Sequence, residues 1–285
     1  MEVKLEHVTA DYQLGPIRSF NVLQDVEMKV ESGSFTAVIG KTGAGKSSLL
    51  KIMNGLLLPK QGKVTIGDAI ITPGKNKKAL KSIRKRVGMV FQFPESQLFA
   101  ETVEQDICFG PLNFGASKEE AKELARKVIK QVGLTADILS KSPFTLSGGQ
   151  KRRIAIAGIL AMEPDILVLD EPGAGLDPKG KLDILSSIAS WHKEQGLTTL
   201  IVTHDMEDVA QFANNIVIMD KGTVVLHDAV RNVFSNKAII DKWQLDVPEA
   251  LKFQMKIEEK TGVKLPKVCL TIEELTESLI EAGLA

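Results

Sequence analysis

The sequence contains few cysteines, no excess of charge and no long apolar run. Cys108 and Cys269 are the only cysteines among 285 residues, and they lie far apart without the spacing of a metal site. We therefore expect a reduced protein in which both act as small apolar side chains. Lysine plus arginine number 36 and aspartate plus glutamate number 36, so the formal net charge is +0. This balance argues against a protein that coats nucleic acid or an anionic membrane through charge alone.

The absence of a long apolar run bears on any membrane role. No run approaches the ~20 residues that a membrane-spanning helix needs, and the segment Met1–His7 does not resemble a signal peptide. Any association with a membrane is therefore expected to depend on a partner. Apolar residues make up 44% of the chain and charged residues 25%, which are ordinary values for a globular protein. A packed core is expected, in one large domain or in one domain with an appendage.

Two kinds of strand pattern occur along the chain. Apolar and polar residues alternate near the N-terminus, as in Val26–Val30, which predicts half-buried antiparallel strands. Ser34–Ile39 is instead a near-continuous apolar run, as expected of a buried parallel strand. The remaining strand candidates are Lys63–Ile66, Val87–Phe91, Ile166–Asp170, Thr199–Thr203 and Ile216–Met219.

Helical signals separate these strands. A helix is expected over about Lys46–Gly55, and another over Pro178–Gly196, with proline at its first position. Residues 94–164 form a helical block, in which Ser117–Glu120 is a capping box and Gly149–Met162 is a further helix. The alternation predicts an α/β core with an inserted helical segment.

The pattern changes after about residue 236. Pro248–Gly262 is a charged amphipathic helix, and Thr271–Glu274 predicts a second capping box that opens a short last helix. We expect residues 237–285 to form a small helical appendage to a main domain over residues 1–236.

A phosphate-binding loop follows the first buried strand and matches G-x-x-x-x-G-K-[ST]. Its glycines let backbone N–H groups converge on phosphate oxygens, and the next helix adds the partial positive charge of its N-terminus. Lys46 is expected to reach the β- and γ-phosphates of a bound nucleoside triphosphate, and the Ser47 hydroxyl to ligate Mg²⁺. A chance glycine-rich turn is disfavoured by the flanking strand and helix. The residues assigned to nucleotide binding are Gly40, Lys41, Thr42, Gly43, Ala44, Gly45, Lys46, Ser47 and Ser48.

Two carboxylates end a buried strand. Asp170 and Glu171 are expected at the carboxyl edge of the sheet, where ligands bind in such folds. Asp170 is predicted to hold Mg²⁺ through water, and Glu171 to be the general base that polarises the attacking water. The alternative, a solvated acidic turn, is disfavoured by the upstream P-loop and by Pro172, which constrains the exit from the strand.

Three further residues carry weaker signals. His204 follows a predicted strand and is a candidate to contact the γ-phosphate, although a lone histidine there is most often structural. Gln92 also follows a strand and is a candidate to reach Mg²⁺ or the attacking water; an ordinary polar residue explains it equally well on local grounds. Tyr12, the only tyrosine, is a candidate to stack on adenine, with a core or loop aromatic as the open alternative.

The segment Leu146–Gln150 reads LSGGQ and lies well downstream of the P-loop. With the P-loop, Gln92, the Asp170-Glu171 pair and His204, it resembles the motif set of ATP-binding cassette (ABC) ATPases over about residues 1–235. In that family two such domains sandwich two ATP molecules head to tail. The resemblance implies that the signature completes a partner's ATP site, with Ser147 and Gly149 on the γ-phosphate. The signature residues assigned to nucleotide binding are Ser147, Gly148, Gly149 and Gln150.

The segment Gly173–Asp177 resembles the D-loop, which in that family runs between the two sites. Asp177 is present, whereas Gly173 departs from the Ser or Thr often found there. No hydrolytic position departs from the pattern, so an active site is expected. The resemblance implies a P-loop NTPase (RecA-like) core with an N-terminal antiparallel β subdomain and an inserted α-helical subdomain at about 94–164. It also implies a small C-terminal helical domain over 237–285 that steadies the dimer.

A narrower resemblance is carried by Phe91–Phe99 and Thr102–Gly110. These segments are similar to ATPases of energy-coupling factor (ECF) transporters, which import vitamins and also cobalt or nickel ions. The sequence of Phe93–Ser96 is most like that of the second of the two ATPases in the heterodimeric form. The resemblance implies ATP and Mg²⁺ as cofactors and a place at the cytoplasmic face of the membrane. Its implied partners are a second ATPase, a transmembrane coupling protein and a substrate-binding membrane protein, with no nucleic acid.

Other classes of protein share parts of this pattern. Soluble ABC ATPases that act on nucleic acid or ribosomes usually carry two cassettes or long coiled-coil arms, and this chain has neither. A regulatory protein with a vestigial nucleotide site is disfavoured by the intact Lys46, Asp170, Glu171 and His204. An ATPase of another ABC transporter class stays open as an alternative.

Overall fold

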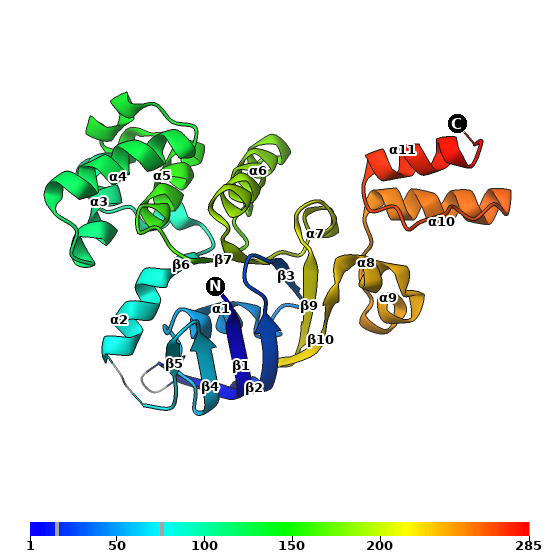
Figure 1. Ribbon diagram of the computed structural model, residues 1–285, viewed down its shortest axis with the longest axis horizontal. Helices are drawn as coiled ribbons and strands as arrows, with labels where there is room; N and C mark the ends of the chain where they lie inside the picture. The colour runs from blue at the N-terminus through cyan, green and yellow to red at the C-terminus, as the bar shows by residue number, and fades with distance from the viewer. Residues whose placement is uncertain (15–16, 75–76, 285) are drawn as a thin grey trace.

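The computed structural model describes residues 1–14, 17–74 and 77–284, and it contains two sheets that lie against each other (Figure 1). The N-terminal sheet is antiparallel, in the order β2-β1-β4-β5. Val26, Met28 and Val30 are buried and alternate with the exposed Glu27 and Lys29, as the apolar–polar pattern predicts. Its strands are β1 (Val3–Leu14), β2 (Ile17–Val30), β4 (Gln61–Ile66) and β5 (Ala69–Ile71).

The second sheet is parallel except for its last strand, which runs antiparallel to β9. Every residue of β3 and of β8 is buried, because helices or the other sheet cover both faces of a parallel sheet. The order is β10-β9-β3-β8-β7-β6. Its strands are β3 (Phe35–Ile39), β6 (Val87–Val90), β7 (Ile166–Asp170), β8 (Thr198–Val202), β9 (Asn215–Asp220) and β10 (Thr223–Ala229).

This strand order positions the functional loops. The P-loop follows β3, the Asp170-Glu171 pair ends β7, and His204 follows β8. Because β3, β8 and β7 are parallel neighbours, their carboxyl ends meet at one edge of the sheet. The P-loop, the Asp170-Glu171 pair and His204 therefore lie at the same edge of the sheet.

Several helices follow the strands of this sheet, and the capping residues predict where α6 (Pro178–Gln195) begins and ends. α1 (Lys46–Met53) leaves the P-loop, and α7 (Met206–Phe212) follows the loop with His204. α6 begins at Asp177, whose side chain accepts a hydrogen bond from the Gly180 N–H, and ends at Gly196 in the left-handed conformation. The sequence analysis did not predict α2 (Lys77–Arg86), a short helix before β6.

The inserted helical block lies beyond β6, the edge strand of the parallel sheet, in Figure 1. Capping boxes open all three of its α-helices, at Thr102, Ser117 and Ser147. Buried apolar residues of these helices join the core on one face of the parallel sheet, while a second core fills the space between the two sheets and α1. The helices are α3 (Val103–Asn113), α4 (Lys118–Gln131) and α5 (Gly148–Leu160), with 3₁₀ turns η1 (Pro94–Gln97), η2 (Ala136–Ser140) and η3 (Pro143–Thr145).

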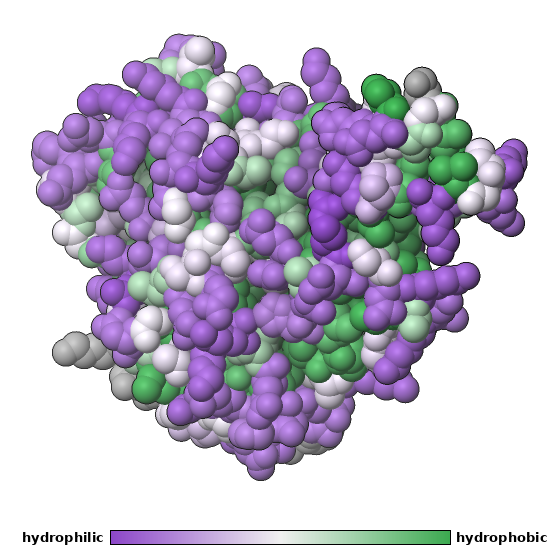
Figure 2. Space-filling model, turned by 45° about the vertical axis from the view of Figure 1, so that its right-hand side comes forward, coloured by the Kyte–Doolittle hydropathy of each residue, from purple (hydrophilic) through white to green (hydrophobic). Residues whose placement is uncertain are grey.

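The C-terminal helices extend from the far side of the molecule (Figure 1). Those that follow β10 are α8 (Val230–Ser235), α9 (Lys237–Trp243), α10 (Glu249–Thr261) and α11 (Ile272–Glu281). Ile239 and Trp243 pack against the main core, whereas α10 and α11 enclose a small cluster of their own that includes Ala250, Cys269 and Leu275. Figure 2, turned to bring this side forward, shows apolar surface gathered there.

The predicted capping box at Thr271 forms only in part. Thr271 Oγ1 accepts a hydrogen bond from the Glu274 N–H at 3.3 Å, as expected. The Glu274 carboxylate instead accepts from the Leu270 N–H at 2.8 Å and pairs with Arg231 at 2.6 Å. The ion pair to Arg231 ties α11 to α8, and this tertiary contact replaces the local one. Among the described residues, no helix is both long and apolar enough to cross a bilayer.

Candidate functional site

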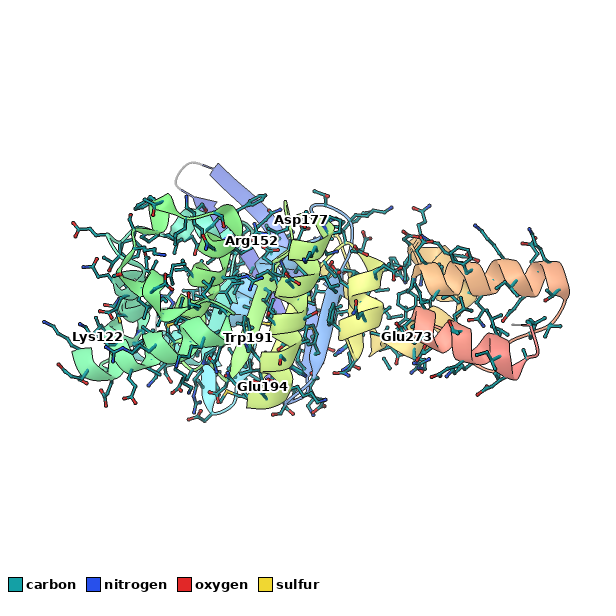
Figure 3. The ribbon with its side chains drawn as sticks, turned by 90° about the horizontal axis from the view of Figure 1, so that it is seen from above. Lys122, Arg152, Asp177, Trp191, Glu194 and Glu273 are labelled. Carbon is teal, nitrogen blue, oxygen red and sulfur yellow. The ribbon has the colours of Figure 1, made fainter. Side chains whose placement is uncertain are left out.

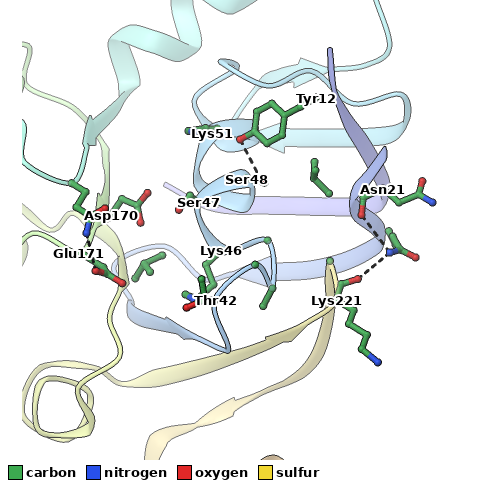
Figure 4. A pocket seen from close by; sticks show the side chains of 18 residues that line it. Tyr12, Asn21, Thr42, Lys46, Ser47, Ser48, Lys51, Asp170, Glu171 and Lys221 are labelled. Atoms are coloured by element: carbon green, nitrogen blue, oxygen red, sulfur yellow. Dashed lines mark hydrogen bonds between the residues drawn. The ribbon is translucent and has the colours of Figure 1, made fainter. Parts of the chain in front are cut away.

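A cavity of about 980 Å³ opens at the carboxyl edge of the parallel sheet (Figure 4). The P-loop forms its floor and the Asp170-Glu171 pair forms one wall, while β1, β2 and the β9–β10 turn contribute the other side. The predicted site residues that line it are Tyr12, Thr42, Gly43, Ala44, Gly45, Lys46, Ser47, Ser48, Gln92, Asp170 and Glu171. The cavity is also lined by Asn21, Val22, Gln24, Lys51, Val202, Lys221 and Gly222, which the sequence analysis did not single out.

Glycine is required at two P-loop positions because of close backbone approaches. A β-carbon at Gly40 would lie 2.2 Å from the Met219 carbonyl oxygen, and one at Gly45 would lie 2.7 Å from that of Val22. Both residues have positive φ, at 149° and 100°. The loop therefore turns tightly onto α1, whose N-terminal N–H groups face the cavity.

The Lys46 side chain stabilises the P-loop by donating hydrogen bonds to its backbone. Its Nζ donates to the carbonyl oxygens of Gly40, at 2.7 Å, and Lys41, at 3.1 Å. Gly40 and Lys41 themselves do not line the cavity, and the Lys41 side chain donates instead to Gln244. Burial lowers the pKa of Lys46, although the nearby charges of Glu171 and Asp170 oppose this. A partly desolvated ammonium beside a loop of N–H donors is suited to bind phosphate oxygens.

The two carboxylates at the end of β7 have different surroundings. Burial raises the pKa of Asp170, opposed by a hydrogen bond with Ser47 and reinforced by the charge of Glu171. Glu171 has a left-handed backbone, at φ 48°, and its side chain contacts two other residues that the sequence analysis predicted for the site. Gln92 Nε2 donates to Glu171 Oε2 at 3.2 Å, and His204 Nδ1 lies 3.5 Å from Glu171 Oε1. Glu171 is thus the point where Gln92 and His204 converge.

An ion-pair cluster braces the loop that carries His204. Lys181 Nζ lies 2.6 Å from Asp205 Oδ2 and 2.8 Å from Asp208 Oδ1. Thr203 Oγ1 donates to Asp208 and accepts from the Asp205 N–H. Burial raises the pKa of Asp208, while its ion pair with Lys181 opposes the shift. The cluster links α6 to the loop beside His204, whose own side chain is 80% exposed.

Tyr12 lies at the end of the cavity away from Glu171 (Figure 4). Ser48 Oγ donates to its hydroxyl at 3.4 Å, and Lys51 Nζ lies 5.4 Å from its ring centroid. Tyr12 also packs against the core between the two sheets, so its stacking on adenine stays a prediction.

The signature motif does not line this cavity. Ser147 caps α5: its hydroxyl accepts from the Gln150 N–H at 3.3 Å, and the Gln150 side chain accepts from the Ser147 N–H at 3.1 Å. Ser147, Gly148 and Gly149 are exposed. Asp177 likewise caps α6 and is absent from the cavity lining. The signature residues and Asp177 are therefore separate from the cavity that the P-loop forms in this chain.

The donors around the cavity suit a magnesium ion. Ser47 supplies a hydroxyl, Asp170 a carboxylate and Gln92 an amide oxygen, which are the hard oxygen ligands that Mg²⁺ prefers, completed by water and phosphate. No cluster of three or more His, Cys, Asp or Glu side chains suited to a metal occurs in the described part of the chain. The site therefore fits an ion that arrives with a nucleotide rather than a closed metal cage.

Comparisons with known proteins agree with this geometry. Residues 23–174 match the family model described as ABC transporter. The energy-coupling factor transporter ATP-binding protein EcfA2 of Listeria monocytogenes is 54% identical over 98% of this chain and 97% of its own length. The protein of the same name from Bacillus cereus is 51% identical over 99% of this chain and 96% of its own.

Two solved structures share the fold. CbiO1 from Clostridium perfringens, part of the ABC transporter complex CbiONQ, has a TM-score of 0.72 at 33% identity, over 92% of this chain and 98% of its own. The ATP-binding cassette MJ0796, solved as a dimer in a post-hydrolysis state with ADP and Pi, has a TM-score of 0.70 at 30% identity, over 80% and 99%. The protein therefore belongs to the ABC transporter family and, within it, to the energy-coupling factor transporter ATP-binding proteins.

Proposed function

We propose that this chain is the second ATPase of a heterodimeric pair that powers an energy-coupling factor importer. The observation that carries the proposal is the division of one chain into two half-sites. The P-loop, Asp170 and Glu171 surround one cavity, whereas the signature residues lie exposed outside it. A chain built in this way needs a second cassette to complete each nucleotide site.

In the half-site that this chain owns, each residue has a separate role. Lys46 and the P-loop N–H groups bind the β- and γ-phosphates, and the Tyr12 ring supports the adenine. Glu171 takes up a proton from the attacking water as general base. Gln92 and His204, which both contact Glu171, orient the water and the γ-phosphate. Ser47, Asp170 and Gln92 would hold Mg²⁺, which neutralises phosphate charge when bound.

The residues of the second half-site, in the signature motif, act on the nucleotide that the partner binds. Gly148 and Gly149 open α5 in the first turn of the helix, where N–H groups have no helical carbonyl partner, whereas the N–H groups of Ser147 and Gln150 bond to each other's side chains. Ser147 and Gly149 would contact the γ-phosphate on the partner's P-loop, and Asp177 would lie between the two sites. The MJ0796 cassette, solved as a dimer, is a precedent for an association of two such cassettes.

The transported substrate is a vitamin or a transition-metal ion, and the assembly sits at the cytoplasmic face of the membrane. Its other members are a transmembrane coupling protein and a substrate-binding membrane protein. Residues 1–236 form the ATPase domain, and residues 237–285 form a helical domain that stabilises the dimer. The relatives named EcfA2 and CbiO1 support this placement, since their names assign them to such transporters.

A substitution in the signature motif tests the division of labour. Ser147→Arg places a bulky cation at the signature and leaves this chain's own cavity intact. After co-expression with the cognate ATPase, turnover at the partner's P-loop is expected to fall, while ATP affinity at this chain's P-loop is kept. Trapping labelled nucleotide on each subunit identifies which one loses turnover. A fully active, transport-competent homodimer of this chain alone would contradict the heterodimer.

The membrane partners are tested by isolating the native complex. Pull-down of the tagged chain after detergent solubilisation is expected to recover a second ATPase and small membrane proteins in fixed ratio. A tagged Lys46→Ala chain is the matched bait, because it keeps the outer surface of the protein but is expected to lose tight ATP binding. Recovery of ribosomal or nucleic-acid components in place of membrane proteins would contradict a role in transport.

A further inference from the structure

Arg152 is the largest fully buried side chain in the described part of the molecule, with 2% of its surface exposed. It lies on α5, five residues beyond Ser147, and no role was assigned to it from the sequence. Figure 3 shows it on the side of the helical block that faces α6, near the end that carries Asp177. A buried guanidinium is expensive unless its N–H groups are all paired, so its partners matter.

Those partners come from two separate loops. Arg152 Nε and Nη2 donate to the two oxygens of Glu95, at 2.9 Å and 2.8 Å, in a bidentate pair. Its Nη1 donates to the carbonyl oxygens of Pro172, at 3.2 Å, and Ala174, at 2.8 Å. Burial acts to raise the pKa of Glu95, but the hydrogen bonding and charge of Arg152, together with a backbone hydrogen bond, lower it below its ordinary value. The guanidinium therefore holds both loops with its planar fork of donors.

These two loops carry the hydrolytic residues of this chain's own site. Glu95 follows Gln92 by one short turn, and Pro172 follows Glu171 directly. Gln92 donates to Glu171, and the Ala174 N–H donates to the Glu171 carbonyl at 3.0 Å. Arg152 thus closes a ring of contacts that runs from α5 through Glu95 and Gln92 to Glu171 and back through Ala174.

Aromatic packing reinforces the same ring. The Phe93 ring lies 5.9 Å from the Arg152 guanidinium carbon. Phe93 has a left-handed backbone, at φ 55°, and a β-carbon at Gly175 would lie 3.1 Å from its ring. The strained residue Phe93 therefore bridges the loops before α3 and after β7 at the point where Arg152 joins them.

We propose that Arg152 is a positioning residue that links the signature helix to the loops of Gln92 and Glu171. Because α5 is a continuous helix from Ser147 onward, a shift of the signature on the partner's nucleotide moves Arg152 with it. The shift then sets the geometry of Glu171 in this chain's own site, so each ATP influences hydrolysis of the other. The inference rests on the proposed function in one respect, namely that the signature serves a partner.

Removal of either member of the pair tests this role in the complex with the cognate ATPase. Arg152→Gln is expected to lower turnover by roughly 10- to 100-fold, because small displacements of reacting groups cost that much. ATP affinity, measured by titration, is expected to stay within about twofold, as for a residue that acts only beyond ground-state binding. Glu95→Gln is expected to behave alike, and the double variant to be no worse than the poorer single variant.

Two further variants separate positioning from mere structure. Arg153→Gln alters the adjacent arginine, which contacts Val132 and Asp183 but neither loop, and its turnover is expected to stay normal. Arg152→Lys keeps the charge opposite Glu95 but lacks the planar fork that also reaches Pro172 and Ala174. The midpoint of thermal unfolding of Arg152→Lys is expected to lie closer to the parent value than that of Arg152→Gln, while its turnover stays low.

Several results would overturn the proposal. Normal turnover in Arg152→Gln, a loss of ATP affinity that matches the loss of turnover, full activity in Arg152→Lys, or multiplicative losses in the double variant would each do so. Glu171→Gln is measured alongside as the reference. If Glu171→Gln turned over normally, the proposed hydrolytic function itself would fail, and that failure would be recognised separately from the behaviour of Arg152.

Discussion

A β-carbon at Gly173 would lie 2.7 Å from Cγ of Lys181. The glycine leaves room for the Lys181 side chain to cross the loop after β7 and reach Asp205 and Asp208 on the far side. The family's usual Ser or Thr at this position would have to displace that side chain. Gly173 and Lys181 therefore form a matched pair that supports the loop of His204.

Lys181→Met is expected to loosen that loop. It removes both ion pairs and leaves Asp205 and the buried Asp208 as neighbouring carboxylates without their cation. The free energy of unfolding is expected to fall by roughly 1–3 kcal/mol, the usual cost of leaving a buried polar group without its partner. Urea denaturation measures the loss, and ATP turnover is expected to fall with it.

Gly173→Ser provides the milder companion to Lys181→Met, since it crowds the Lys181 side chain without removing it. It is expected to lower turnover in the parent, and to have little further effect on turnover in Lys181→Met, where the ion pairs that it would disturb are already absent. Equal effects of Gly173→Ser in both backgrounds would argue that the two residues act independently.

Lys46→Ala is expected to abolish tight ATP binding. The Lys46 side chain lines the cavity at the P-loop, and a charge-assisted hydrogen bond from it to a phosphate would contribute about 1.5–3 kcal/mol, or roughly 10- to 100-fold in affinity. The substitution also removes the two hydrogen bonds that Lys46 makes to Gly40 and Lys41. Fluorescent-nucleotide titration gives the affinity, and Lys41→Ala is the matched control because Lys41 points away to Gln244. Unchanged affinity in Lys46→Ala would contradict its role.

Glu171→Gln is expected to bind ATP and barely hydrolyse it. Loss of a positioned general base typically lowers turnover by ~10²–10⁴-fold, while the P-loop contacts are untouched. The amide also keeps a hydrogen-bonding group opposite Gln92 and His204, so the local structure should persist. The variant should accumulate as a closed, ATP-bound dimer that gel filtration detects. Near-normal turnover would mean that another group acts as base.

His192 gives the fold a pH-dependent stability. Its Nδ1 lies 3.1 Å from Thr199 Oγ1, its ring packs edge-on against Phe35, and burial lowers its pKa from the ordinary value of 6.5. Between the folded pKa and 6.5 the unfolded chain binds more protons than the folded chain, so stability falls as the pH drops through 6.5. Below the folded pKa the loss reaches its limit.

His192→Gln is therefore expected to lose less stability than the parent when the pH falls from about 7.5 to about 5.5. Urea midpoints at the two pH values measure this difference. A parent protein with the same pH dependence as the variant would show that His192 does not carry the effect. His227, whose pKa burial also lowers, contributes a slope of the same sign in both proteins and so cancels in the comparison.

Local patterns predicted much of the fold. Buried apolar runs predicted the parallel strands, and the sequence rules for helix ends placed α4, α6 and α10 closely, because those signals involve residues within a few positions of one another. The family resemblance predicted the α/β cassette and the ECF group, and the comparisons confirm both. The three-residue strand β5 carried too little periodicity to be predicted, whereas α2 was missed although Leu80 and Ile83 have helical spacing.

Long-range contacts could not be predicted in this way. The sequence analysis assigned no role to Arg152 or Lys181. Arg152 is one of three consecutive basic residues, Lys151–Arg153, and nothing local indicates its pairing with Glu95, 57 residues away. At Thr271 the local signal for a capping box was present, but Arg231 pulls the Glu274 carboxylate into a tertiary ion pair. Such contacts depend on how helices approach each other, which periodicity does not encode.

The C-terminal helices are expected to hold the subunits together between catalytic cycles. They expose large apolar side chains, with Phe253 at 55% and Ile280 at 61% exposure, around a small core of their own. Deleting residues 237–285 should leave ATP binding intact and weaken association in the absence of nucleotide, as sedimentation would measure. Because the deletion also removes Ile239 and Trp243 from the main core, a gentler variant is needed beside it.

Phe253→Ser combined with Ile280→Ser keeps every helix and removes only exposed apolar surface. It is expected to raise the dissociation constant of the nucleotide-free dimer, since burying such side chains contributes about 1.5–3 kcal/mol each. Ile70→Ser is the control, because Ile70 is equally apolar and 50% exposed but lies on β5, at the edge of the N-terminal sheet. If the double variant and the Ile70→Ser control associate equally well, the C-terminal helices serve another purpose than joining the subunits.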